Sequence, residues 1–438
     1  MTVDPQELAA RVSEARDRTL SLVADLDDDQ WLGPRLDIVN PPLWEVGHVG
    51  WFQEFWVLRH AWGRPALRED GDRLYDSSRI PHDTRWDLPL PSRKRTVEYL
   101  EQVRDAVLQG IARSGPTSRD RYFLELAVFH EDMHGEAFLY TRQTHAWPAP
   151  RALAGALPST QPGVLAPAEG DAHVPGGAFQ LGSLRDGSFV FDNEKWAHRV
   201  YLEPLAIART AVTQEAYARF VDDGGYERRD LWSDEGWRWR SETGARRPVY
   251  WRKEDGAWLR RHFDRWVALE PDLPVAHVSW FEADAWCRWA GRRLPTEAEW
   301  EAAASAEPGR AGGLPGTKRR YPWGDSLPGP GLANLDAAAG GTMSVHALAA
   351  GDSAFGCRQM IGNVWEWTDS DFGPYPGFSA DPYEDYSRPW FGTQKVLRGG
   401  CWTTRSRLIR NAYRNFYTPD RRDVFAGFRT CALSTSGL

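Results

Sequence analysis

Residues 40–56 read NPPLWEVGHVGWFQEFW, and their spacing predicts a helix that carries a histidine among aromatic side chains. Two prolines open the segment, and proline is common in the first turn of a helix. After them, one histidine and four aromatic residues recur at i, i+3, i+4, i+7 and i+8: His48, Trp51, Phe52, Phe55 and Trp56. This is the spacing of a single helical face, so the histidine faces the same way as the aromatic side chains.

Three further helices are expected in the first 145 residues. Apolar residues repeat with helical spacing over residues 8–22 and 97–111, and an apolar run covers 122–140. Four long helices with connecting loops are typical of a bundle. The longest connection, about residues 63–91, is long enough to be a functional loop.

A change of composition near residue 150 predicts a domain boundary. Residues 146–171 hold five prolines and many small residues, which is typical of a linker between a domain at 1–145 and a second at 172–438. In the second domain glycine, tryptophan and turn signals are frequent, which favours an α+β fold. Helices are expected at 280–290 and 296–304, and Thr296 and Glu299 have the spacing of a capping box.

Composition excludes several classes of protein. The 438 residues are 42% apolar and 26% charged, the balance of a soluble globular protein, and the net charge of -8 argues against a nucleic-acid partner. No run of about 18 apolar residues predicts a membrane span. A cytoplasmic protein is therefore expected, and four scattered cysteines fit reduced thiols. Tryptophan side chains suit cores and ligand pockets equally well, so the count of 23 does not distinguish the two uses.

The segment FHEDMHGEAF, residues 129–138, predicts a metal site. His130 and His134 would lie one helical turn apart on one face, and His48 would supply a third ligand from the facing helix. Three neutral imidazoles suit Fe(II), Zn, Cu or Ni. Two alternatives stay open at this point: the histidines are structural, or HEDMH is the H-E-x-x-H motif of a metalloprotease with Glu131 as its base.

Five motifs follow in order in the second domain: LPTEAEWEAAA (294–304), YPWGD (321–325), GNVWEWT (362–368), RGGCW (398–402) and RNFYTPDRRDVFAGFR (414–429). Together they resemble the formylglycine-generating-enzyme or sulfatase-modifying-factor domain, a C-type-lectin-like fold. NPPLWEVGHVGWFQEFW and FHEDMHGEAF resemble the DinB-like helical domain that carries a three-histidine iron site. The combination resembles the ergothioneine-type sulfoxide synthases, which use Fe(II) and O2 to join a thiol to C2 of hercynine, the trimethylated betaine of histidine.

The resemblance implies roles for individual residues. His48, His130 and His134 would bind iron, and Glu131 would not be a base. Tyr375, in DFGPYPGF, lies in a segment resembling the one with the active-site tyrosine, which supplies a proton or an electron. Three consecutive residues would contact the betaine, with aromatic faces against its trimethylammonium group: Asn415, Phe416 and Tyr417.

The chain departs from the family pattern in its expected substrate contacts. Met133 replaces a glutamine that touches the hercynine imidazole, and Phe416 and Tyr417 replace a tryptophan and an acid. The loop 75–91 lacks a common basic stretch. Arg79 and Arg85 are the candidates to bind the carboxylates of a cysteine or γ-glutamylcysteine donor. A carbohydrate donor would need neutral hydrogen-bonding groups and aromatic faces instead.

Residues 45–59 together with HEDMHGEAF most resemble the selenoneine synthases, in which a selenosugar is the donor and the new bond is C–Se. A sulfur donor is the alternative. A true formylglycine-generating enzyme would need a copper-binding cysteine pair, which Cys401 and Cys431 do not match. A non-enzymatic lectin-like binding module is a further alternative, and a structural Ca2+ in the lectin-like domain stays open.

Overall fold

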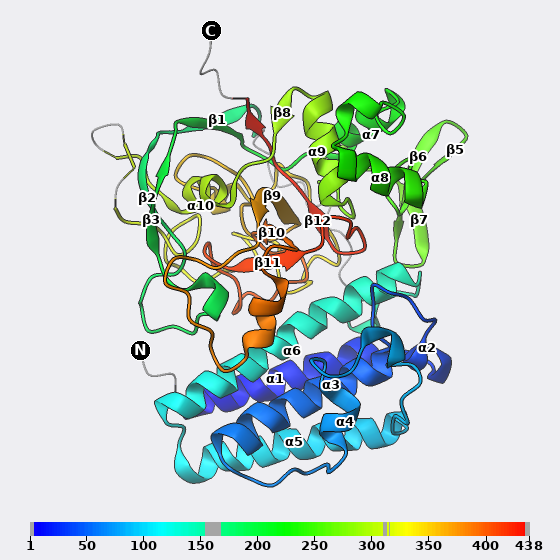
Figure 1. The fold of residues 1–438 in the computed structure, drawn as a ribbon, viewed down its shortest axis with the longest axis vertical. Coiled ribbons are helices and arrows are strands. Elements are labelled where there is room, and N and C mark those ends of the chain that lie inside the picture. Colours follow the sequence, from blue (N-terminus) through cyan, green and yellow to red (C-terminus); the bar gives the residue numbers. More distant parts are fainter. Residues whose placement is uncertain (1–3, 154–167, 310–312, 315, 434–438) are drawn as a thin grey trace. The chain divides into compact units, whose positions relative to one another are not determined.

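The computed structural model describes residues 4–153, 168–309, 313–314 and 316–433, and its contacts divide the chain into two units (Figure 1). Unit 1 comprises Met1–Ala154 with Gly187–Phe189, and unit 2 comprises Gly155–Asp186 with Val190–Leu438. Much of the expected linker, residues 154–167, lies outside the described residues. The domain boundaries set from the sequence therefore stay predictions.

Unit 1 is helical, and the bundle predicted from the sequence is confirmed. Four segments form its long helices: α1 (Pro5–Val23), α3 (Pro42–Gln53), α5 (Arg93–Ser114) and α6 (Ser118–Thr144). Helix α1 packs against α5 and α6, and α3 also packs against both (Figure 1). Short elements lie between and after them: α2 (Asp28–Leu32), α4 (Gly71–Tyr75), η2 (His82–Thr84) and η3 (Arg151–Leu153).

Local sequence explains where these helices begin. Asp4 caps α1, Ser92 caps α5, and Thr117 forms a capping box with Asp120 at the start of α6. The side chains predicted to form the inner face of α1 are all buried: Leu8, Val12, Ala15 and Leu22. Helix α3 continues directly into a π-helix, η1 (Glu54–Ala61), which the periodicity did not predict.

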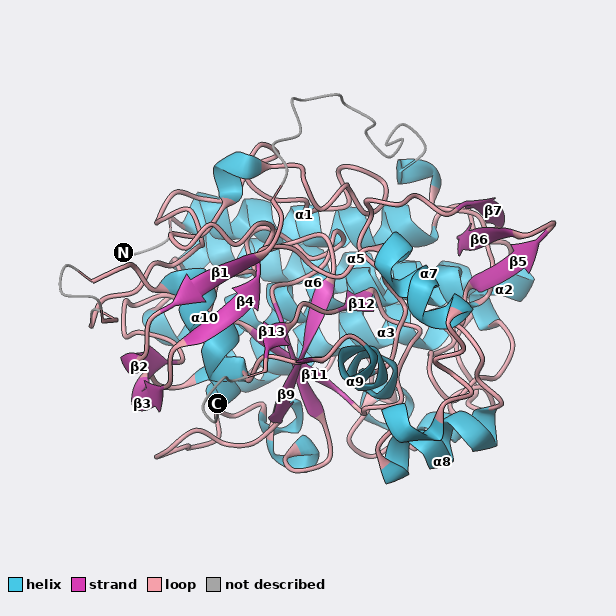
Figure 2. Cartoon of the chain, turned by 90° about the horizontal axis from the view of Figure 1, so that it is seen from above, coloured by secondary structure: helices cyan, strands magenta, loops and turns pink. Residues whose placement is uncertain are grey.

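The described residues of unit 2 form four small sheets joined by long loops (Figure 2). One sheet has the order β1-β4-β13-β8, with β1 (Asp171–Val174), β4 (Leu205–Ala208), β13 (Cys431–Ala432) and β8 (Arg292–Arg293). A second has the order β11-β10-β9-β12, with β11 (Arg414–Tyr417), β10 (Lys395–Arg398), β9 (Trp365–Asp371) and β12 (Ala426–Gly427). The others are β2 (Gly177–Leu181) with β3 (His198–Leu202), and β5 (Trp251–Glu254), β6 (Ala257–His262) and β7 (Arg265–Ala268).

The helices of unit 2 are short. The two that were predicted are α9 (Trp280–Trp289) and α10 (Glu297–Ser305), and the capping box between Thr296 and Glu299 is present. The sequence did not predict α7 (Gln214–Asp222) and α8 (Asp234–Thr243). Five 3-10 turns complete the unit: η4 (Asp192–Glu194), η5 (Arg229–Leu231), η6 (Ala349–Gly351), η7 (Glu384–Tyr386) and η8 (Arg388–Trp390).

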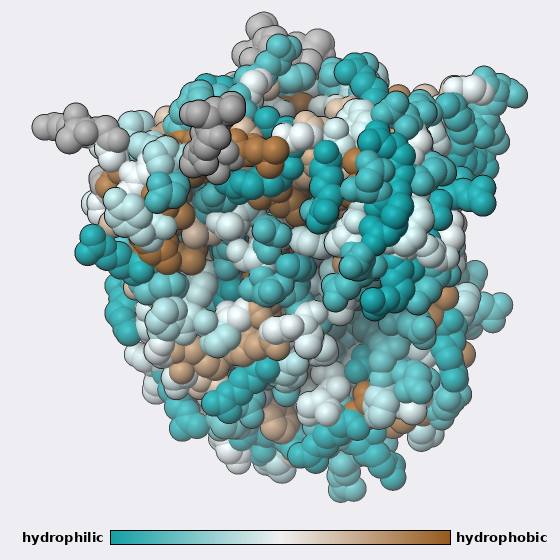
Figure 3. Space-filling view, turned by 45° about the horizontal axis from the view of Figure 1, so that its top comes forward, coloured by the Kyte–Doolittle hydropathy of each residue, from teal (hydrophilic) through white to brown (hydrophobic). Residues whose placement is uncertain are grey.

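Much of the tryptophan excess fills cores. Four tryptophans of the motifs in unit 2 are almost wholly buried: Trp300, Trp365, Trp367 and Trp402. The surface is largely hydrophilic over the face in Figure 3, with scattered apolar patches. No helix among the described residues is long and apolar enough to cross a bilayer.

Candidate metal centre

The three predicted histidines come together inside unit 1. His48 projects from α3, and His130 and His134 project from α6. One ring nitrogen from each histidine lies within 4.8 Å of the others, and the Nε2 atoms of His48 and His130 are 3.3 Å apart. Among the described residues, this trio is the group of three or more potential ligands that could hold a metal ion.

The tautomers of two imidazoles are set by hydrogen bonds on the far side of the ring. His48 Nδ1 donates to the carbonyl oxygen of Tyr75 at 2.7 Å. His134 Nδ1 donates to Oε1 of Glu45 at 2.6 Å. Because Nδ1 carries the proton in both rings, Nε2 is left with its lone pair toward the other histidines. This is the usual arrangement of metal-binding histidine and its hydrogen-bond partner.

Aromatic side chains hold the rings in place. Trp44 stacks on His48 with ring centroids 4.9 Å apart, and Phe52 stacks on His130 at 3.5 Å. Both histidines are almost wholly buried, whereas the His134 side chain is 18% exposed. Burial lowers the pKa of His48 and His130 well below the usual value, and each is lowered further by neighbouring His134. Both imidazoles are therefore neutral at neutral pH, as ligands must be.

The donor set fits a divalent transition metal. Metal–imidazole bonds are about 2.0–2.1 Å long, so two nitrogens that share one ion lie roughly 3–3.4 Å apart. The distance between the His48 and His130 Nε2 atoms falls in that range. Three imidazole nitrogens would leave coordination positions for other molecules, and imidazole accepts iron, zinc, copper or nickel.

Glu131 does not occupy the position of a metalloprotease base. Its carboxylate receives two hydrogen bonds from Arg16, from Nε to Oε1 at 2.8 Å and from Nη2 to Oε2 at 3.2 Å. Both side chains are almost wholly buried. A carboxylate held in this way stabilises the bundle and does not activate water, so the structure argues against the metalloprotease alternative.

The other candidates of unit 1 have different surroundings. Met133 lies on α6 beside His134 and is half-buried. The Arg85 guanidinium lies over the Trp44 ring at 3.8 Å, and donates to Asn40 Oδ1 and to the carbonyl oxygen of Ile80. Burial lowers the pKa of Arg85 to about 10.

Arg79 is placed differently from Arg85. Its side chain is 78% exposed and forms an ion pair with Asp76, from Nε to Oδ2 at 3.1 Å. The two arginines predicted to bind donor carboxylates therefore both have partners within unit 1.

The predicted betaine contacts lie on β11 of unit 2, where they alternate in direction. Asn415 and Tyr417 are half-buried on one face of the strand, and Phe416 is buried on the other. Phe416 stacks on Phe372 with centroids 3.9 Å apart. One face of the Phe416 ring is therefore used in packing, while Asn415 and Tyr417 share the more open face.

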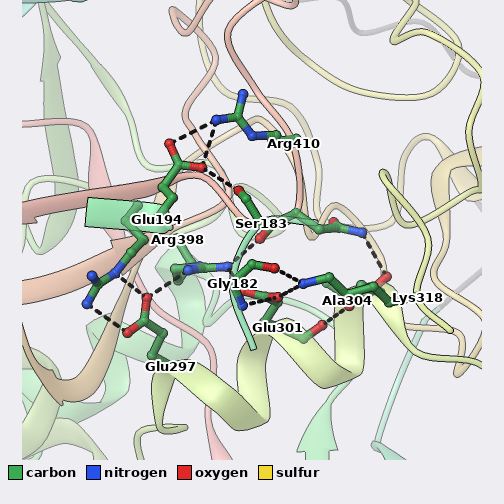
Figure 4. Close-up of polar contacts among 12 residues, drawn as sticks. Gly182, Ser183, Glu194, Glu297, Glu301, Ala304, Lys318, Arg398 and Arg410 are labelled. Atoms are coloured by element: carbon green, nitrogen blue, oxygen red, sulfur yellow. Dashed lines mark hydrogen bonds and ion pairs between the residues drawn. The ribbon is translucent and has the colours of Figure 1, made fainter. Parts of the chain in front are cut away.

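Tyr375 belongs to a buried polar network in unit 2. Its hydroxyl donates to Oε1 of Glu297 at 3.0 Å, and the Arg414 guanidinium lies over its ring at 4.2 Å. Burial raises the pKa of Tyr375 well above the usual value, although Arg414 opposes the shift. The network continues along α10, where Arg398 bonds to both Glu297 and Glu301 (Figure 4).

Sequence reasoning missed Glu45 as a partner of the centre, although a signal was present. Glu45 precedes His48 by three residues and therefore lies on the same face of α3. Four cysteines are buried and form no disulfide among the described residues: Cys287, Cys357, Cys401 and Cys431.

Comparisons with known proteins agree with this architecture. Residues 158–433 match the family described as sulfatase-modifying factor enzyme 1-like domain, and residues 11–138 match the DinB superfamily. The match confirms the C-type-lectin-like unit that was predicted after the helical bundle.

Relatives of nearly full length are named hercynine oxygenase. One from Mycolicibacterium thermoresistibile is 40% identical over 431 residues, covering 97% of this chain and 94% of the relative. One from Mycobacterium tuberculosis is 38% identical and covers 97% and 98%. A formylglycine-generating enzyme from Streptomyces coelicolor is 33% identical, but the alignment covers 66% of this chain and 95% of that protein.

These matches argue against the non-enzymatic alternative, because relatives aligned over 97% of this chain are named hercynine oxygenase. The formylglycine-generating enzymes match only part of the chain. The chain therefore belongs to the ergothioneine-type sulfoxide synthase superfamily, and it is an oxidoreductase built from a DinB-like and a sulfatase-modifying-factor-like unit.

Proposed function

We propose that the chain is a non-heme Fe(II) enzyme that uses O2 to form a C–Se bond between imidazole C2 of hercynine and a selenosugar. The named relatives support hercynine as the acceptor. The gathering of three imidazoles, with the Nε2 atoms of His48 and His130 3.3 Å apart, supports a mononuclear metal centre at His48, His130 and His134. Bound iron would supply the redox chemistry, with O2 as the oxidant that accepts the electrons released when C2–H is replaced by C2–Se.

One observation favours a donor without carboxylates. An amino-acid or γ-glutamyl thiol needs cations to bind its carboxylates, and Arg79 and Arg85 were the candidates. Arg85 is buried, stacked on Trp44 and bonded to Asn40, and Arg79 is paired with Asp76. Both guanidiniums have partners within unit 1, although the buried Nε of Arg85 has no hydrogen-bond partner among the described residues. These partners support a sugar donor over cysteine or γ-glutamylcysteine. Subgroup resemblance in residues 45–59 supports selenium in that sugar.

The chain's own residues have separate tasks in this proposal. Met133 gives the hercynine imidazole an apolar contact next to His134. Asn415 and Tyr417, on the open face of β11, hold the betaine, with the Tyr417 ring against the trimethylammonium group. Phe416 supports that strand by packing on Phe372.

Tyr375 is proposed as the proton or electron source. Its proton is held at the phenol oxygen, which already donates to Glu297. A structural Ca2+ in unit 2 stays a prediction. The sulfur enzymes remain the second candidate, since the name hercynine oxygenase does not specify the donor.

An aerobic assay with Fe(II), hercynine and four donors tests the proposal. The donors are cysteine, γ-glutamylcysteine, a thiosugar and a selenosugar, and products are identified by mass spectrometry. We expect the wild type to couple hercynine to the selenosugar. His134→Ala should lose both this activity and its stoichiometric iron. His60→Ala is the matched control, because His60 is exposed and outside the trio. Coupling only to the amino-acid thiols would overturn the selenium assignment.

A further inference from the structure

The three histidines of the centre differ in what holds the side of the ring away from the metal position. His48 donates to a neutral backbone oxygen, that of Tyr75. His130 is covered face to face by Phe52. His134 has a carboxylate partner, Glu45, and it is also the most exposed of the three rings.

Glu45 lies buried in the helical bundle, where it contacts His134. Its side chain is 1% exposed, and its ion pair among the described residues is with His134. It lies on α3 one turn before His48, so one helix face presents both a ligand and the partner of a ligand on α6. Burying a carboxylate is costly, and a cation nearby offsets that cost.

Arg85 interacts with Glu45 electrostatically but makes no direct hydrogen bond to it among the described contacts. Arg85 stacks on Trp44 and bonds to Asn40 and Ile80, and it forms no ion pair with Glu45 among the described contacts. A divalent ion on the opposite side of the His134 ring would pair with Glu45 through the imidazole. Such a carboxylate–histidine–metal arrangement fixes the ring and raises the basicity of its ligating nitrogen.

We propose that Glu45 is a positioning residue that orients His134 with Nε2 toward the metal and supplies the negative charge that strengthens this ligand. This inference rests on the metal centre of the proposed function. Helix α3 would then contribute to the centre in two ways. His48 would bind the ion directly, and Glu45 would act through His134 on α6. Loss of Glu45 should therefore weaken metal binding without removing any ligand.

Co(II) titration of the metal-free full-length protein tests the proposal, with visible absorption as the readout. We expect Glu45→Ala to bind Co(II) about 10- to 100-fold more weakly than the wild type, with an altered absorption spectrum. Glu45→Gln keeps the shape and one acceptor oxygen, so its loss should be smaller. It also serves as the test variant if Glu45→Ala does not fold, as judged by circular dichroism.

Glu54→Gln is the matched control. Glu54 is also buried in unit 1, but it accepts from the Tyr99 hydroxyl and the Leu67 amide and does not contact the histidines. Its Co(II) affinity should match that of the wild type. The proposal is overturned if the Glu45 variants bind Co(II) within twofold of the wild type, or if Glu54→Gln loses as much affinity.

The titration requires neither hercynine nor a donor, so the two proposals fail separately. A protein that binds Co(II) in a Glu45-dependent manner but couples no selenium or sulfur donor to hercynine would overturn the reaction and leave the role of Glu45 intact. A wild type that binds no Co(II) at the three histidines would overturn both.

Discussion

Glu131→Gln should destabilise the helical unit without acting directly at the metal centre. The change removes the carboxylate that pairs with Arg16, whose side chain is fully buried. The guanidinium would keep hydrogen bonds to the Leu100 carbonyl oxygen and to Gln53, but no carboxylate within ion-pair distance among the described contacts. Leaving one charge of a buried pair unpaired costs about 3–5 kcal/mol. Because glutamine keeps one acceptor oxygen, we expect a loss of about 3 kcal/mol in the free energy of unfolding.

Urea unfolding of the metal-free protein, followed by far-UV circular dichroism, measures this loss. The double variant Arg16→Met/Glu131→Leu removes both charges and should recover much of the stability, since a buried ion pair is often replaceable by apolar side chains. Glu98→Gln is the control, because Glu98 pairs with exposed Arg95 and should lose less than about 1 kcal/mol.

The opposite result would refute the structural role. In a metalloprotease, Glu131→Gln would keep the fold and the metal and would lose only catalysis. An unfolding free energy within about 1 kcal/mol of the wild type would show that the Arg16 pair does not stabilise the bundle.

Further predictions concern the metal centre, the pH response and the reaction. A Cβ at Gly47 would lie 2.3 Å from the Tyr75 ring, so Gly47→Ala should shift the residue that anchors His48 and weaken Co(II) binding at least tenfold, about the cost of a lost ligand partner. Gly135→Ala on α6 meets only ordinary contacts and should bind Co(II) normally. Burial lowers the pKa of His262 to about 4, against about 6.5 when unfolded. The unfolded chain then binds the extra proton, so stability should fall by up to about 1.4 kcal/mol per pH unit as pH drops from 6.5 toward 4. His262→Gln should reduce the slope by this amount in urea unfolding at several pH values, while other buried histidines with lowered pKa values, such as His277, keep their own contribution. An unchanged slope would contradict the assignment. Tyr375→Phe should reduce coupling by at least tenfold and cost about 1 kcal/mol of stability for the lost hydrogen bond. Full coupling by mass spectrometry would remove Tyr375 from the reaction.

Local spacing predicted much of the metal centre. The face of α3 that carries His48, and the single turn between His130 and His134, follow from helical periodicity alone. Spacing could not predict the π-helix after Gln53. In a segment rich in aromatic residues, the apolar pattern does not distinguish a π-helical turn from an α-helical turn. Phe55 was expected on the buried face and is only half-buried.

Partners distant in sequence explain what the motifs could not predict. Glu131 fits a protease motif over five residues, but its partner Arg16 is 115 residues away. The stacking of Arg85 on Trp44 likewise depends on the course of a long loop, while its role as a substrate contact stays a prediction. The strands of unit 2 were also not predicted individually, because buried charges such as Arg398 and Arg414 interrupt the alternation of apolar residues.

Ligands, tautomer partners and ring packing of the metal centre all come from residues of one helical unit, between Trp44 and His134. Substitutions in the other unit can therefore accumulate during evolution without altering the ability to load an ion. Such independence allows a lineage to change the compounds it accepts while its redox centre stays constant. For an engineer, metal content reports on the integrity of the helices, and substrate screens can be directed to libraries in unit 2 and at Met133.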